Sequence, residues 1–252
     1  LEAVLYVFAD ALMRRRSDPV TVDDVQVAVK EVYDRVKGAY SVAGITSEGM
    51  YAFRDPFGIK PCIFGKKVTP EGTWYAVASE SVVLDVAGYE IVRDLKAGEM
   101  LWIGKDRVPH LRQVAGKPHR PCIFEYVYFA RPDTFLDGTS VYEARMELGR
   151  RLGRAFLDTK LVADVVIPVP ESARTAGQTM AEVIGVPCRE GFVKNRYVGR
   201  TFIMPNDKAR QATIRTKLNP IRAEFEGKRV VILDDSIVRG TTSRQMVKIA
   251  RQ

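Results

Sequence analysis

Two adjacent carboxylates, Asp234 and Asp235, directly follow a run of four apolar residues at 230–233. Such a run is typical of a buried parallel strand, and ligands of open α/β folds bind at the carboxyl ends of these strands. Paired carboxylates at this position can accept hydrogen bonds from sugar hydroxyls or bind a hard divalent cation. The pair is therefore a candidate ligand site.

A short polar loop leads from these carboxylates into a predicted helix. Gly240 permits close approach of the backbone to a ligand, and hydroxyl groups follow at Thr241, Thr242 and Ser243. Free N–H groups and the helix dipole favour a phosphate at such a position. A solvated strand end before a capped helix is the ordinary alternative, and it would account for either aspartate alone. The whole sequence 230–243 is more specific and predicts phosphate and sugar sites side by side.

The net charge of +8 is concentrated in one segment. Residues 189–222 contain nine basic and two acidic residues, whereas the first 120 residues are nearly neutral. A basic run can be a solvated surface or a nucleic-acid patch. This one lies between two candidate phosphate-binding elements, so we expect it to serve a small phosphorylated ligand.

Two different halves must position these residues. Residues 1–108 combine helical patterns with short strands, which predicts an α+β arrangement. Strand–helix–strand patterns fill residues 122–252 and predict a parallel sheet. We place a linker at 109–121, where periodicity is weak. Both ends of the chain are abrupt, and we therefore expect an internal piece of a longer protein.

Local signals refine this outline. Thr21 can cap a helix over 22–36, and strands at 39–45 and 50–53 are typical of a hairpin. In the second half we expect strands at 163–170, 188–193 and 230–233. A helix is expected over 172–184, and another begins near Ser243.

Further segments share a resemblance to one family. They are Phe124–Asp133, Val166–Ser172 and Lys194–Ile203, with Arg54–Pro61 and Ala78–Ser81 in the first half. Together with 230–243 they resemble glutamine phosphoribosylpyrophosphate (PRPP) amidotransferase, the family of the first committed step of de novo purine synthesis. The resemblance implies the C-terminal part of an N-terminal-nucleophile glutaminase domain at 1–108. It implies the N-terminal part of an α/β type I phosphoribosyltransferase domain at 122–252, so that both domains would be truncated.

The resemblance assigns roles in a PRPP site residue by residue. It implies that Asp234 and Asp235 hold the ribose and, with Ser172, bind Mg²⁺. The other PRPP-binding positions that it implies are Glu171, Ser236, Arg239, Gly240, Thr241, Thr242 and Ser243. Pyrophosphate would lie at the turn 170–172, where backbone amides precede a helix.

The basic segment resembles a loop, 194–217, that closes over PRPP in the family. Lys194, Tyr197 and Arg200 match its characteristic positions and are the implied catalytic residues. A basic lid excludes water from C1 and brings positive charge to the departing pyrophosphate. The implied reaction converts PRPP, glutamine and water to 5-phosphoribosylamine, glutamate and pyrophosphate. Positioning and charge stabilisation would supply the catalysis.

The chain lacks the cysteine nucleophile that the resemblance would require for glutamine hydrolysis. Family members release ammonia from glutamine with an N-terminal cysteine, but this chain begins at Leu1. We therefore expect no glutaminase activity from it, which an assay of glutamate release would test. Cys122 matches the first ligand of an iron–sulfur (4Fe–4S) cluster that one branch of the family contains, and the resemblance leaves the cluster open. Cys62 and Cys188 lie in apolar runs typical of buried structural cysteines.

The resemblance also implies partners and a location. Purine nucleotides would be feedback inhibitors, and the protein would be a homo-oligomer, a tetramer in the family. No apolar run approaches the roughly 20 residues needed to cross a bilayer. Three widely spaced cysteines fit a reducing compartment. We expect a cytoplasmic enzyme without nucleic-acid or membrane partners.

Two alternatives share the strand and its aspartate pair. A base-salvage phosphoribosyltransferase would lack the glutaminase-like residues 1–105 and the segment 194–200. A PRPP-binding transcriptional regulator would carry a winged-helix module, and no helix-turn-helix pattern precedes the predicted PRPP fold. DNA binding with a steep dependence on salt would favour the regulator.

Overall fold

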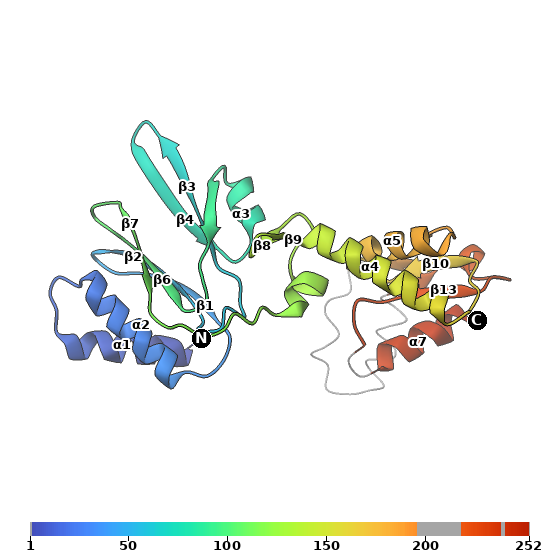
Figure 1. The fold of residues 1–252 in the computed structure, drawn as a ribbon, viewed down its shortest axis with the longest axis horizontal. Helices are drawn as coiled ribbons and strands as arrows, with labels where there is room; N and C mark the ends of the chain where they lie inside the picture. Colours follow the sequence, from blue (N-terminus) through green and yellow to red (C-terminus); the bar gives the residue numbers. More distant parts are fainter. Residues whose placement is uncertain (1, 196–217, 238–239, 252) are drawn as a thin grey trace. The chain divides into compact units, whose positions relative to one another are not determined.

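A computed structural model of the 252-residue chain describes residues 2–195, 218–237 and 240–251 (Figure 1). The chain divides into two compact units, Leu1–Val141 and Tyr142–Gln252. Within the described ranges, no helix is both long enough and apolar enough to cross a membrane.

The first unit begins with two helices that pack on a four-stranded antiparallel sheet (Figure 1). The helices are α1 (Glu2–Arg15) and α2 (Val22–Arg35). The sheet has the order β1-β2-β6-β7, with β1 at Ser41–Ile45, β2 at Gly49–Arg54, β6 at Glu99–Gly104 and β7 at Pro109–Gln113. Side chains alternate along β2, so Tyr51 and Phe53 face the helices and stack near Phe8 of α1. The expected hairpin is β1 paired with β2.

A second sheet packs on the other face of the first. Its order is β4-β3-β5, with β3 at Ile63–Thr69, β4 at Gly72–Ala78 and β5 at Glu90–Asp94, and helix α3 (Ser81–Val86) follows β4. Ala52 and Leu101 alternate with the helix-facing residues and pack with Phe64 and Leu95 in a separate buried cluster. Helices, first sheet and second sheet therefore form three layers.

Helix α2 begins with a capping box, as the Thr21 pattern predicts. Thr21 Oγ1 accepts the Asp24 N–H at 3.3 Å, and Asp24 Oδ2 accepts the Thr21 N–H at 3.0 Å. Asp24 is buried, and its hydrogen bonds, above all from the Thr21 hydroxyl, hold its pKa well below the usual range. Two orphan donors of the helix end are thus satisfied reciprocally.

We expect Thr21→Ala to lower the free energy of unfolding by about 1 kcal/mol, because the first turn of α2 loses its side-chain cap. Thr21→Ser keeps the hydroxyl and is the matched control, with stability close to wild type. Urea denaturation measures both. Equal stability of the alanine and serine variants would show that the cap does not stabilise the fold.

Residues 122–141 belong to the first unit. They form a π-helical turn (Glu125–Phe129) and a small hairpin of β8 (Phe135–Leu136) and β9 (Thr139–Ser140). Hydrogen bonds join them to the rest of the unit, among them Lys60 to Glu125 at 2.6 Å, Glu80 to Thr134 at 2.9 Å and Arg54 to Asp137 at 2.6 Å. The unit therefore ends later than the linker expected at 109–121, and residues 109–113 of that segment form β7.

The second unit contains the parallel strands that the sequence predicts. Strand β10 (Val165–Pro168) pairs in parallel with β13 (Val230–Leu233), and Cys188 adds a parallel bridge to Val166. Alternate residues of both strands face two separate buried clusters. One cluster includes α4 (Val141–Asp158) and α5 (Arg174–Ile184), and the other includes α7 (Thr241–Ala250). Helices therefore cover both faces of the parallel pair.

The strand expected at 188–193 differs from the observed structure. Only Cys188 bridges the parallel sheet, whereas β11 (Phe192–Lys194) pairs antiparallel with β12 (Leu218–Pro220). The physical reason is burial, since Phe192 and Leu218 pack with Met246 of α7 in one cluster. A short 3₁₀ turn, Arg222–Glu224, leads towards β13.

Candidate functional site

Three of the predicted site residues, Ser172, Asp234 and Asp235, lie at the edge where β10 and β13 end. The strands are in register to their last residues, Pro168 opposite Leu233, and Val169 N–H donates to Leu233 O at 2.8 Å. The two segments that leave this edge carry Ser172 and the pair Asp234 and Asp235. The parallel register is therefore what brings residues more than sixty positions apart into contact.

Hydrogen bonds join these side chains directly. The Ser172 hydroxyl donates to Asp235 Oδ2, and the Ser236 hydroxyl donates to Asp235 Oδ1 at 2.8 Å. The Asp235 N–H donates to Asp234 Oδ1 at 3.0 Å. Among the residues that the structure describes, no lysine or arginine forms an ion pair with either carboxylate. The edge is thus a cluster of oxygen atoms whose negative charge is not balanced by any described lysine or arginine.

This environment changes the acidity of Asp234. Burial raises the pKa of its carboxyl group to about 6, and the negative charge of Asp235 adds to the rise, while the Asp235 N–H opposes it. Both main causes disfavour the ionised form. A cation or a donor-rich ligand would relieve this unfavourable charge.

We expect the stability of the fold to depend on Asp234 between pH 3.8 and about 6. In that range the folded chain binds the carboxyl proton and the unfolded chain does not. The contribution of Asp234 to the free energy of unfolding is therefore largest at low pH, and it is lost as the pH rises through about 6. Asp234→Asn stays neutral, and its stability relative to wild type should therefore increase over this range. Chemical denaturation at several pH values measures the difference. A difference that is constant with pH would contradict the raised pKa.

The loop after the carboxylates leads into the N-terminus of α7, as predicted. Gly240 adopts the left-handed conformation, with φ of 71°, and immediately precedes the helix. A Cβ atom at Gly240 would meet no other atom within 4 Å, so space is open on this side of the backbone. Thr242 and Ser243 lie in the first turn, where N–H groups have no helical partner. Thr241 begins the helix, and Arg239 lies outside the described residues.

The turn after β10 supplies the other wall. Glu171 is exposed and Ser172 is half-buried, and the peptide bond between Pro170 and Glu171 is cis. Helix α5 begins two residues after Ser172 and packs against β10. The backbone of 170–172 is thus presented at the strand edge next to the carboxylates.

The expected lid is described only at its base. Lys194 is exposed at the end of β11 and is paired with Leu218 of β12. The strand pair therefore holds both ends of the basic segment together. The other two predicted catalytic residues, Tyr197 and Arg200, lie outside the described residues.

The cysteines do not assemble a metal centre within the described parts of the chain, where no group of three or more His, Cys, Asp or Glu side chains could hold a metal ion. Cys122 is partly exposed and is a free thiol. Cys62 is buried, and burial raises its pKa to about 12, which fits the expected structural role. Cys188 is only partly buried. The described residues thus contribute one candidate cluster ligand, Cys122, and not a ligand set, so no step is assigned to a cluster.

No family model matches the chain. An amidophosphoribosyltransferase of Pseudomonas aeruginosa is 49% identical over 255 residues, covering 100% of this chain and 51% of the relative. That of Saccharomyces cerevisiae is 47% identical over 259 residues, with the same coverage. The glutamine PRPP amidotransferase of B. subtilis, complexed with ADP and GMP, has a TM-score of 0.79 and 38% identity, covering 97% of this chain and 51% of that one. The chain spans about half the length of these relatives, and throughout that span it is similar in sequence and fold to amidophosphoribosyltransferases.

Proposed function

We propose that the protein is an amidophosphoribosyltransferase of purine synthesis, which forms 5-phosphoribosylamine from PRPP, glutamine and water. One observation carries the proposal. The parallel strands β10 and β13 end together, and they place Ser172 on Asp235 beside the helix that begins after Gly240. This arrangement offers a cation site, a sugar site and a phosphate site in one place. Identity of 49% to an enzyme of that name supports it.

The oxygen atoms at the strand edge fit Mg²⁺, which takes carboxylate ligands and otherwise keeps water and substrate phosphates. Asp234, Asp235 and Ser172 would hold it. Neither carboxylate forms an ion pair with a lysine or arginine in the described ranges, which is consistent with that role. When bound, Mg²⁺ would neutralise charge on the pyrophosphate leaving group.

The protein's own groups would position the rest of PRPP. First-turn N–H groups of α7, with the Thr242 and Ser243 hydroxyls, would hold the 5′-phosphate. The aspartate pair would accept hydrogen bonds from the ribose hydroxyls. The backbone at Glu171 would face the pyrophosphate. Lys194, with Tyr197 and Arg200, would close over the sugar, exclude water and stabilise the leaving charge.

The finer features of the proposal follow from the same similarity. The first unit would be part of an N-terminal-nucleophile glutaminase domain, and the second part of a type I phosphoribosyltransferase domain. Purine nucleotides would act as feedback inhibitors, since the B. subtilis relative is complexed with ADP and GMP. A homo-oligomer and a cytoplasmic location stay predictions.

Acceptor specificity tests the proposal. The whole protein, purified and supplied with PRPP and Mg²⁺, should release pyrophosphate when ammonia is added and not when adenine, guanine or hypoxanthine is added. Release that depends on a purine base would favour a salvage enzyme instead. PRPP binding without turnover, together with salt-sensitive DNA binding, would favour a regulator.

A further inference from the structure

The first unit contains a cavity of about 390 Å³ that the proposed reaction does not use. Its lining includes the side chains of Arg54, Lys96, Gln113, Lys117, His119 and Asp137. All of them belong to residues 1–141, whereas the candidate PRPP site belongs to the second unit. A volume of this size is within the range of small-molecule sites, roughly 300–1,000 Å³.

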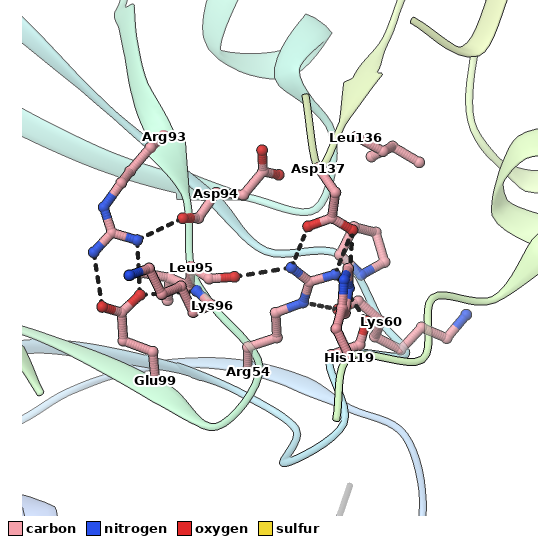
Figure 2. Close-up of polar contacts among 12 residues, drawn as sticks. Arg54, Lys60, Arg93, Asp94, Leu95, Lys96, Glu99, His119, Leu136 and Asp137 are labelled. Carbon is pink, nitrogen blue, oxygen red and sulfur yellow. Dashed lines mark hydrogen bonds and ion pairs between the residues drawn. The ribbon is translucent and has the colours of Figure 1, made fainter. Parts of the chain in front are cut away.

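The acidic group of the cavity is already neutralised. Arg54 is buried, and all five of its N–H groups donate: to Asp137 Oδ1 (2.6 Å) and Oδ2 (2.9 Å), and to the carbonyl oxygens of Lys60 (2.7 Å), Gly58 (2.8 Å) and Leu95 (2.8 Å). Figure 2 shows this fork, with the His119 ring beside the Asp137 carboxylate. The Nε2 atom of His119 lies 3.3 Å from Asp137 Oδ2. Asp137 therefore has little capacity left to attract other cations.

Two lysines of the lining have no carboxylate within ion-pair distance among the described residues. Lys60, Lys66 and Lys105 of the same unit each pair with a glutamate. In the described part of the chain, the ammonium groups of Lys96 and Lys117 form no ion pair. The Glu99 carboxylate attracts the Lys96 ammonium group only at longer range, because Arg93 donates to both of its oxygens, at 2.7 and 2.8 Å (Figure 2).

The walls that carry these lysines are fastened to each other. The Gln113 side chain donates to Ala97 O at 2.7 Å and also to Ala115 O. The N–H groups of Val114 and Ala115 both donate to Gly98 O, at 2.9 and 3.1 Å. The segment before Lys117 is thereby held against the turn after Lys96. The backbone of these walls is therefore pre-organised, and binding would have to order mainly the exposed side chains of Lys96 and Lys117.

We propose that this cavity binds a phosphate dianion, as a small phosphate monoester or as inorganic phosphate. The Lys96 and Lys117 ammonium groups, which form no ion pair with any described residue, match a charge of −2. Hydrogen bonds between charged groups and phosphate are stronger than those between neutral groups. His119 lies at the same wall and adds a donor when it is protonated. The volume exceeds that of phosphate alone, which favours a ligand with an attached organic group.

The two histidines of the chain allow a direct test. His119 lines the cavity, whereas His110 does not and lies on β7, paired with Asp106 at 2.9 Å. Titration of the chain with inorganic phosphate or glycerol 3-phosphate, at fixed pH and ionic strength, should shift the imidazole NMR signal of His119 to saturation. The His110 signal should stay in place. Tighter binding of glycerol 3-phosphate would identify an ester ligand, and equal binding would identify inorganic phosphate.

Paired charge variants make the test specific. Lys96→Gln/Lys117→Gln should weaken the apparent affinity at least about tenfold, because two charged hydrogen bonds are lost. Lys66→Gln/Lys105→Gln removes the same charge from the same unit and should not change it. Parallel, non-saturating shifts of both histidines, or equal affinity in the two variants, would overturn the proposal. The readout lies in the first unit, so its failure leaves the PRPP assignment untouched.

Discussion

Asp234→Asn and Asp235→Asn, each made in the whole protein, are expected to reduce ammonia-dependent pyrophosphate release by at least about a hundredfold. The substitution keeps the size of the side chain but removes a negative charge from the proposed Mg²⁺ and ribose site. Both carboxylate oxygens of Asp235 accept a hydrogen bond from a serine hydroxyl. Asparagine at this position replaces one of these acceptors by an NH₂ group, which cannot accept. Steady-state release of pyrophosphate at saturating Mg²⁺ measures the effect.

A matched control separates this loss from a general effect of charge. Asp158→Asn removes an exposed aspartate from the end of α4 in the same unit and should keep full activity. Isothermal titration with Mg²⁺ and PRPP should show weakened binding only in the site variants. Wild-type binding and turnover in both site variants would remove the aspartate pair from the mechanism.

The second large effect is on stability. Asp137→Asn should lower the free energy of unfolding by about 3 kcal/mol, because it leaves the Arg54 guanidinium buried without its counter-charge. Asparagine tolerates the left-handed backbone at this position, where φ is 48°, so the change isolates the charge. Urea denaturation of the chain measures the loss.

A double-mutant cycle completes this test. Arg54→Met/Asp137→Asn should be less destabilised than the sum of its single variants, since no unpaired charge is left inside. Asp133→Asn breaks an exposed pair with Arg131 at 2.8 Å and is the control, with little effect expected. Additive single effects, or equal effects at Asp137 and Asp133, would show that the buried pair is not special.

The candidate site was predictable because its signal is local. The apolar run 230–233, two carboxylates and a glycine before a helix follow one another in the chain, and the structure shows that order as β13, the strand edge and α7. The partner strand β10 is also an apolar run. Parallel strands end at a common edge, so the fold brings Ser172 and Asp235 into contact, although only the resemblance singled out Ser172.

Helix α4 is not predicted from the sequence, and its glycines show the reason. Its sequence contains Gly149 and Gly153, and glycine disfavours a helix interior. The structure explains both: an added Cβ would lie 2.1 Å from Thr179 Oγ1 at Gly149 and 2.7 Å from Val183 Cβ at Gly153. Close approach to α5 thus requires residues that argue against a helix when read alone.

Long-range pairing limits prediction in the first unit as well. Residues 109–113 look irregular in isolation, but they complete the sheet because β6 offers them a free edge. The fork between Arg54 and Asp137 joins residues 83 positions apart, and nothing near either one announces the other. Asp137 and Gly138 form the two-residue turn between β8 and β9, and nothing in that turn identifies the buried partner of Asp137.

The register of β10 on β13 limits which substitutions the two strands tolerate. A slip of one residue would move Ser172 about 3.3 Å along the sheet relative to Asp235. The same slip would turn every apolar side chain of one strand towards the wrong buried cluster. Misalignment of the site is therefore never a small local error, because it disrupts the whole core of the unit. A substitution of a buried residue in these strands that shifts the register would therefore prevent folding, and would not yield a folded protein with an altered site.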